Sequence, residues 1–80
     1  MSPAERARLA FAVDASDKAS QDMYRAAGAW FGSPINSTDA ATQLRVAALR
    51  EAHEQARATE HKALCALRAL VVELLRGRRA

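Results

Sequence analysis

The chain has 80 residues, a net charge of +3 and a single cysteine, and half of its residues are apolar. This length accommodates one domain, residues 1–80, and the apolar content excludes an intrinsically disordered chain. A single cysteine excludes an internal disulfide bond. Because so short a chain buries only about 60 % of the surface of its unfolded state, we expect a partner subunit to contribute to its stability.

The excess positive charge is confined to the C-terminus. Residues 1–75 carry equal numbers of basic and acidic side chains, so the excess consists of Arg76, Arg78 and Arg79. We expect residues 76–80 to form a basic flexible tail, whose arginines are candidate contacts for phosphate groups or an acidic partner. A nucleic-acid-binding domain normally gathers lysine and arginine on one folded surface, so nucleic acid is not the expected partner.

A first helix is predicted from about residue 3 to residue 30. Ser2, Pro3 and Glu5 form the sequence pattern of a capped helix start. Apolar and small residues then recur with the alternating spacing of a heptad repeat, at Leu9, Val13, Ser16, Ser20, Met23, Ala27 and Trp30. The polar stretch DASDKASQD leaves open a break near residues 14–17, which would give three helices instead of two.

A second, longer helix is predicted over about residues 38–76. Gly32 and Pro34 end the first helix, and four favourable N-cap residues follow, namely Asn36, Ser37, Thr38 and Asp39. Neither glycine nor proline occurs from there to Gly77, which is a natural stop. The predicted fold class is therefore all-α, an antiparallel helical hairpin with a short first helix and a long second one.

If the linker is a tight bend, the second helix extends about ten residues, or about 15 Å, past the start of the first. This overshoot is apolar on nearly every side, and a helix that is apolar all round must be buried all round. We expect a second copy of the chain to cover it and form a four-helix dimer, through Leu67, Leu70, Val71, Leu74 and Leu75. A groove in a different protein, or N-terminal residues that bend over the overshoot, are the alternatives.

Residues suited to catalysis or metal binding are sparse. His53-Glu54 begins like a zinc protease motif, but Arg57 stands where the second histidine is needed. His53 and His61 are interpreted as solvated helix residues, and Cys65, in an apolar run, as buried and inert. We therefore expect a protein that is not an enzyme, with no cofactor, no metal and no small-molecule substrate.

The sequence offers no segment for a membrane. No run approaches the ~20 apolar residues of a transmembrane helix, and the apolar stretch that follows Arg8 is too short for a signal peptide. We expect a cytoplasmic protein in which Cys65 is reduced and which has no membrane partner.

The predicted bend carries the most prominent aromatic residues. Trp30 completes the heptad pattern and is expected to close the end of the hairpin, whereas Phe31 and Ile35 are the candidate partner contacts. Trp30-Phe31-Gly32 in the turn of a helical hairpin resembles the WXG-type proteins exported by type VII secretion, which are dimerising hairpins. The chain departs from that family in being shorter, and VVELLRGRRA lacks the tyrosine of the export signal.

The favoured function is that of a small non-catalytic protein-binding module, an adaptor, regulator or inhibitor of a larger protein, acting as a homodimer. The sequence is also compatible with a heterodimer in place of the homodimer. The alternative functions are a WXG-like hairpin exported by type VII secretion, and a small nucleic-acid-associated regulator that uses the basic tail.

Overall fold

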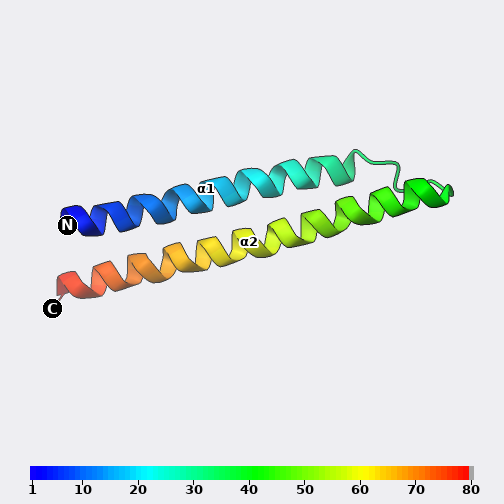
Figure 1. The fold of residues 1–80 in the computed structure, drawn as a ribbon. Helices are drawn as coiled ribbons and strands as arrows, with labels where there is room; N and C mark the ends of the chain where they lie inside the picture. The colour runs from blue at the N-terminus through cyan, green and yellow to red at the C-terminus, as the bar shows by residue number, and fades with distance from the viewer. Residues whose placement is uncertain (80) are drawn as a thin grey trace.

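The computed structural model describes residues 1–79, and side chains as far as Gly77. It consists of two helices, α1 (Pro3–Phe31) and α2 (Ala40–Arg79), joined by a linker of residues 32–39. The helices run antiparallel beside each other, with the N- and C-terminal ends together at one end, here called the open end (Figure 1). The linker lies at the other, closed end. The predicted all-α hairpin is confirmed, and each helix end lies within about three residues of its prediction, the usual uncertainty of such boundaries.

The hairpin is elongated rather than compact. It measures 61 × 17 × 13 Å and has a radius of gyration of 18.1 Å, whereas a compact chain of this length has a radius of about 12 Å. Its accessible surface is 6143 Å², while a compact monomer of the same mass exposes about 4,700 Å². The lone hairpin therefore exposes about 1,400 Å² more than its mass predicts.

The start of α1 has the predicted capping box. The hydroxyl oxygen of Ser2 accepts a hydrogen bond from the backbone N–H of Glu5 at 3.1 Å, and the Glu5 carboxylate accepts one from the N–H of Ser2 at 3.0 Å. The helix then runs unbroken through residues 14–17, so the alternative with three helices is wrong. Ser16 is tolerated in the buried face because its hydroxyl donates to the carbonyl of Val13 at 2.8 Å.

The linker spans the distance between the helix ends and includes a turn at residues 34–37, rather than forming one tight bend. Gly32 caps α1 by donating its N–H to the carbonyl of Gly28 at 2.9 Å. Further along, the N–H of Ser37 donates to the carbonyl of Pro34, and the side-chain amide of Gln43 donates to the carbonyl of Ser37 at 3.0 Å. These bonds hold the linker against the first turns of α2.

Asp39 is the N-cap of α2. Its carboxylate accepts hydrogen bonds from the hydroxyl of Thr42 at 2.8 Å and from the backbone N–H of Thr42 at 3.0 Å. These two bonds, the hydroxyl bond first, hold the pKa of Asp39 below its ordinary value. Of the four candidate caps in the sequence, the last one occupies the position, because it directly precedes the first helical residue.

Asp39 should make the stability of the hairpin depend on pH in the acidic range. Because its pKa is lower in the folded chain, protonation favours the unfolded chain, so the stabilisation is present above the ordinary pKa of about 3.9 and is lost as pH falls through the lower folded value. We expect Asp39→Ser, which keeps a capping oxygen without a charge, to melt below the wild type at neutral pH and close to it at about pH 2. Circular dichroism melts at both pH values measure this, and a gap that is the same at both would contradict it.

The two helices meet at positions spaced alternately three and four residues apart, here called the contact positions. Those of α1 are Leu9, Ala12, Ser16, Ala19, Met23, Ala26 and Trp30, and those of α2 are Thr42, Val46, Leu49, His53, Ala56, Glu60, Ala63, Leu67, Leu70 and Leu74. Of the residues predicted for the heptad pattern of α1, every second one is a contact position, namely Leu9, Ser16, Met23 and Trp30. Val13 is exposed instead, and Ala12 takes its place. Small residues in the middle, with Ser16 and Ala19 only 5 % and 6 % exposed, indicate where the helix backbones approach most closely.

The predicted alignment of the two helices, and with it the apolar overshoot, is wrong. Arg8 forms an ion pair with Glu73 at 3.1 Å, and the Trp30 ring stacks on His53 with 5.4 Å between ring centroids. The start of α1 therefore reaches the last turns of α2, and about 20 Å of α2 lies beyond Trp30 at the closed end instead. Eight linker residues can span that length at ~3.3–3.6 Å each, so no tight bend is required.

The C-terminal end also differs from the prediction. The helix does not stop at Gly77 but continues to Arg79, so Arg76, which is exposed, belongs to α2 and not to a flexible tail. The side chains of Arg78 and Arg79 and the residue Ala80 lie outside the described part of the chain. Within the described part, no helix is both long and apolar enough to cross a membrane.

Candidate functional site

The residues that flank the contact positions form two long sides of the hairpin. Successive helix residues project about 100° apart. Each seven-residue repeat contains two contact positions that lie three residues apart. In an antiparallel pair, the residues that directly follow the second of these positions lie on one side of the hairpin. The residues that directly precede the first lie on the opposite side. Arg8 and Glu73 directly precede Leu9 and Leu74, and their ion pair shows that these preceding positions of the two helices do meet. The other side contains Val13, which follows Ala12.

The side that contains Arg8 is called the ion-paired side. Besides Arg8 and Glu73, it carries Lys18 and Arg25, whose nitrogens lie 2.7 Å and 3.8 Å from the carboxylate of Asp22. The hydrogen bond from Lys18 holds the pKa of Asp22 below its ordinary value, and the charge of Arg25 acts in the same direction. All of these groups are exposed, so each pair contributes little to stability.

The opposite side is called the apolar side, because large apolar residues follow it from one end to the other. Near the open end they are aliphatic, and towards the closed end they are mainly aromatic. Their exposed fractions range from 38 % to 69 %. The members of the apolar side are Val13, Tyr24, Phe31, Ile35, Leu64, Val71 and Leu75. Isolated apolar residues are normal on a protein surface, but a row of them along one side is typical of an interaction site.

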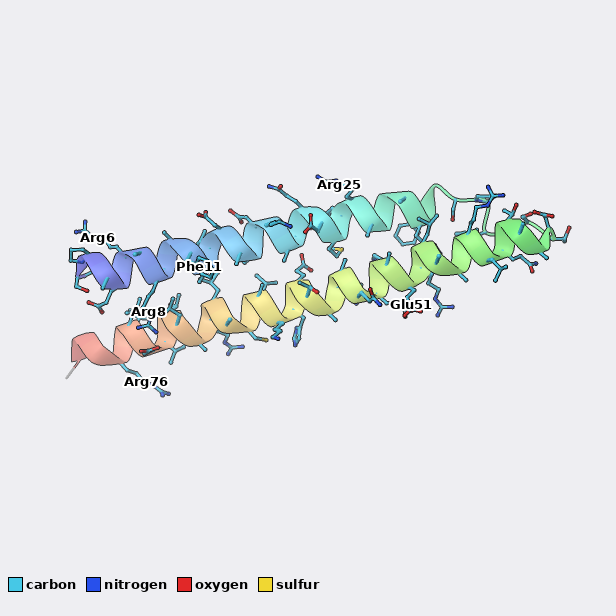
Figure 2. All side chains as sticks on the ribbon, viewed as in Figure 1. Arg6, Arg8, Phe11, Arg25, Glu51 and Arg76 are labelled. Carbon is cyan, nitrogen blue, oxygen red and sulfur yellow. The ribbon has the colours of Figure 1, made fainter. Side chains whose placement is uncertain are left out.

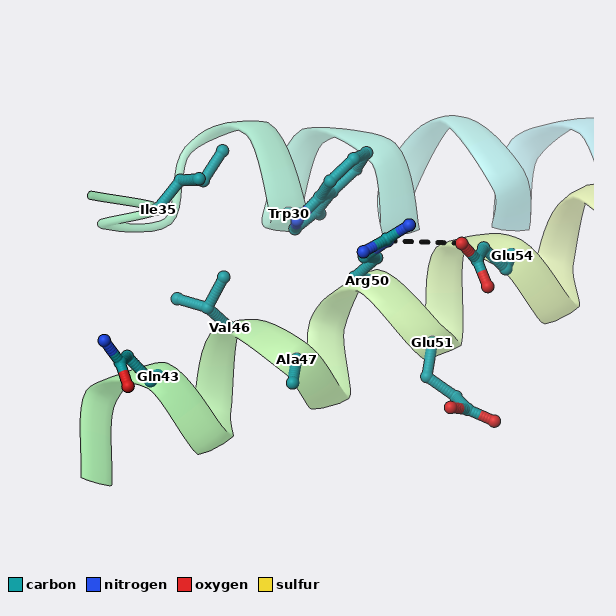
Figure 3. Close-up of a pocket in the computed structure, with 8 residues that line it drawn as sticks. All are labelled: Trp30, Ile35, Gln43, Val46, Ala47, Arg50, Glu51 and Glu54. Atoms are coloured by element: carbon teal, nitrogen blue, oxygen red, sulfur yellow. Dashed lines mark hydrogen bonds and ion pairs between the residues drawn. The ribbon is translucent and has the colours of Figure 1, made fainter. Parts of the chain in front are cut away.

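At the closed end, the apolar side is hollowed into a groove of about 570 Å³. Figure 3 shows Trp30 and Ile35 above the groove, with Val46 and Ala47 on α2 below them. Arg50 bonds to Glu54 at 3.2 Å along its edge. The predicted partner contact Ile35 thus lies in a groove with a mixed apolar and polar lining that α1, the linker and α2 form together.

Trp30 and Phe31 form a ring cluster with His53. The centroid of the Phe31 ring lies 4.8 Å from that of Trp30 and 5.9 Å from that of His53. His53 is only 7 % exposed, so its interpretation as a solvated residue was wrong. The heptad spacing from Val46 to Leu67 passes through His53, and this is the sequence signal that could have placed it in the contact. Trp30 closes the helix pair as predicted, and Phe31 is exposed.

The ion-paired side also has an apolar feature near the open end. Phe11 is 77 % exposed and borders a groove of about 570 Å³ lined mainly by alanines and Leu70, with the Arg8 and Glu73 side chains beside it. Arg8 and Phe11 both extend from α1 towards α2 in Figure 2, whereas Arg76 points away from α1. The heptad pattern does not indicate Phe11, because this residue lies outside it.

The five residues predicted as a dimer interface do not share one environment. Leu70 and Leu74 are 9 % and 8 % exposed and pack against α1, which corrects the prediction that the first helix cannot cover them. Leu67 is half-buried in the same contact. Val71 and Leu75 remain exposed on the apolar side, so only these two of the five are open to a partner.

The side chains suited to catalysis or metal binding are dispersed over the hairpin. Cys65 is exposed, contrary to its prediction as buried, and its Sγ lies 3.6 Å from Nε2 of His61 one turn earlier. Among residues 1–79, no group of three or more histidine, cysteine and acidic side chains lies close enough together to hold a metal ion.

The fold and its two sides define the chain as an all-α helical hairpin with one exposed apolar side. Comparison with protein-family models, curated proteins and solved structures found no match. The resemblance of Trp30-Phe31-Gly32 to the WXG-type hairpins therefore stays a prediction based on those residues.

Proposed function

We propose that the chain is a small non-catalytic protein-binding module that acts as a dimer, as an adaptor, regulator or inhibitor of a larger protein. The observation that carries this proposal is the surface of the lone hairpin, 6143 Å², which exceeds that of a compact monomer of equal mass by about 1,400 Å². Large apolar side chains, among them Tyr24, Phe31 and Leu75, are part of this exposed surface. Association is the simplest way to remove such a surface from water.

The size and position of the exposed residues support binding rather than catalysis. The grooves are open and lie on the surface of two helices, whereas an active site normally excludes water from a concave pocket. The exposed aromatic residues Tyr24 and Phe31 are of the kind that is enriched in protein interfaces, where they bury a large apolar area. A long row of such residues suits an extended contact with another protein.

The dimer can be tested by the mass of the intact assembly in solution. We expect native mass spectrometry and sedimentation to give twice the chain mass of 8.7 kDa. The double variant Val71→Glu, Leu75→Glu should be monomeric yet helical, because both residues are exposed in the hairpin. Changing Leu70 and Leu74 instead would unfold the hairpin, because both are buried within it.

A matched control uses apolar residues that are at least as exposed but lie outside the apolar side. Phe11→Glu and Leu44→Glu change side chains that are 77 % and 73 % exposed, and both variants should remain dimeric. A wild-type chain that is a stable monomer at micromolar concentration would contradict the dimer. Identification of the larger partner requires capture from the native host, followed by reconstitution from purified components.

A further inference from the structure

We propose that a second copy of the chain covers the apolar side, with the two hairpins parallel, so that both open ends lie together and α1 of each copy lies on α2 of the other. This inference rests on the proposed dimer and adds which side pairs and in which direction. The two-fold axis runs along the length of the hairpins, between the two apolar sides, so that each copy presents the same surface to the other.

The direction of the axis determines which helices meet. An axis across the length of the hairpin would keep each helix on its own counterpart, α1 on α1 and α2 on α2, with open end against closed end. An axis along the length exchanges the two helices, so that α1 lies on α2 and open end on open end. The side chains of the apolar side distinguish these two arrangements.

The area of the hairpin suits a second copy. A stable protein interface removes about 800 Å² from each partner. The excess surface of the hairpin, about 1,400 Å² over a compact monomer, is large enough to supply such an interface. The hairpin is also thin, 61 × 17 × 13 Å, and two of them stacked face to face have the layered form of a four-helix bundle.

The charges of the apolar side favour α1 on α2. This side consists of the residues that directly follow the second contact position of each repeat, together with the residues one helical turn further on. At these positions the described part of α2 carries three arginines and one glutamate, whereas α1 carries one acid, Asp17. Stacking α2 on α2 would bring two positively charged surfaces together, which costs free energy. The charged residues of α2 on this side are Arg50, Glu54, Arg57 and Arg68.

Contacts within one hairpin give the level of each residue along its length. Arg8 contacts Glu73 and Trp30 contacts His53, and the residue numbers add up to 81 in the first contact and 83 in the second. Both helices rise equally per residue, so an α1 residue lies level with the α2 residue for which this sum is about 82. An axis along the length leaves the levels unchanged. The same sum therefore gives the facing residues of the second copy, with no adjustable shift between the copies.

Both exposed aromatic residues of α1 then face an arginine. Tyr24 lies within one residue of level with Arg57 of the second copy, and Phe31 lies within one residue of level with Arg50 of the second copy. Tyr24 is 69 % exposed in the lone hairpin, so its ring is open to such a contact. An arginine over an aromatic ring gains a cation–π interaction. The arginines of α2 therefore have favourable partners on α1.

The aliphatic residues of both copies gather near the open ends. Val13 lies two residues, or about 3 Å, from level with Val71 of the second copy. Leu75 lies one turn beyond Val71, and Leu64 lies two turns before it, on the same side of α2. Because the two-fold axis repeats each contact, these residues form one apolar cluster that is removed from water. With open end against closed end, they would instead face the arginines near the closed end.

Distances between spin labels test the direction. In a Cys65→Ser background, a nitroxide is attached at Ala7→Cys near the open end, or at Leu44→Cys near the closed end, both exposed positions outside the apolar side. Pulsed electron paramagnetic resonance should give about 30 Å between the labels of the two copies in each case, because like ends lie together. Open end against closed end would give about 45 Å or more in each case. Gln21→Cys, near the middle of the hairpin, is the matched control and should give a short distance in either arrangement.

Three results would overturn the inference, and they are distinguishable. Long distances at Ala7 and Leu44 with a short one at Gln21 reverse the direction of the copies. Short distances that the double variant Val71→Glu, Leu75→Glu leaves unchanged mean that another side pairs, while the proposed dimer stands. A chain that shows no coupling between labels and sediments as a monomer removes the inference and the proposed dimer together.

A charge exchange gives an independent measurement. Asp17 lies three residues, or about 4.5 Å, from level with Arg68 of the second copy, a gap that the arginine side chain spans. Asp17→Arg and Arg68→Asp should each weaken the dimer by about two- to fivefold, and the double exchange should restore it, because opposite charges again face each other. Asp14→Arg is the matched control, since Asp14 lies on the outer face of α1, and it should change the dissociation constant by less than about twofold. A double exchange that weakens the dimer as much as the two single changes combined would contradict the facing of these residues.

Discussion

The Leu70→Ala variant should lose about 2 to 5 kcal/mol of the free energy of unfolding. Leu70 is only 9 % exposed and lies between α1 and α2 near the open end. Removal of three carbon atoms leaves a cavity that two rigid helices cannot fully close. Because the stability of small domains is itself only about 5 to 15 kcal/mol, a loss of this size should leave a substantial unfolded fraction at moderate urea concentration.

Leu44→Ala is the matched control for this variant. It makes the same chemical change on the same helix, but Leu44 is 73 % exposed, and we expect a change of about 0.5 kcal/mol or less. Urea unfolding of both variants, followed by circular dichroism at equal chain concentration, gives the comparison. Equal losses for the two variants would mean that α1 does not cover Leu70, and that the apolar end of α2 is free as the sequence alone suggested.

Ala19→Leu should separate the helices at their closest approach. Ala19 is 6 % exposed and has the buried Ser16 one turn before it, so a larger side chain has no space to occupy. Overpacking of this kind costs about 1 to 3 kcal/mol, which corresponds to a fall in melting temperature of about 4 to 24 °C for a domain of this size.

Ala7→Leu is the control for overpacking, because Ala7 is exposed on the same helix. Leucine and alanine have similar helix propensities, so the melting temperature should change by only a few degrees. Ala19→Ser should also be tolerated better than Ala19→Leu, since serine at the neighbouring Ser16 bonds to a carbonyl of its own helix. If Ala19→Leu melts as the wild type does, the small residues do not set the distance between the helices.

The elements of the fold could be predicted because local signals determine them. The Ser2 and Glu5 capping box and the break at Gly32 and Pro34 act over a few residues, and the structure has each of them where the sequence indicated. The continuity of α2 followed from the absence of glycine and proline. Only Gly77 was misinterpreted, because a single glycine costs a helix about 1 kcal/mol relative to alanine and does not by itself end it.

The alignment of the helices could not be predicted by the same means. It depends on how far the linker stretches, and that is set by packing between residues remote in sequence, such as Trp30 against His53. The choice between Val13 and Ala12 at the contact was open for a related reason, because both satisfy the heptad spacing. The alanine series permits closer packing, and this leaves Val13 on the surface.

The candidate site was predicted in part. Phe31 and Ile35 are exposed as expected, and Val71 and Leu75 remain available to a partner. The apolar side as a whole was missed, although Tyr24 and Phe31, like Leu64 and Val71, are each seven residues apart. That second heptad series is readable in the sequence, but its meaning depends on knowing which residues the hairpin itself buries.

The position of the Trp30–His53 stack determines the order in which the hairpin can close. This contact joins residues 23 positions apart, whereas Arg8 and Glu73 are 65 apart, so closing the longer loop first costs about 1 kcal/mol more in chain entropy. Folding is therefore favoured to begin with the aromatic cluster and to proceed along the helices towards the chain ends. Leu70 and Leu74 are covered last, which makes this end of α2 the segment most exposed to aggregation while the chain is still folding.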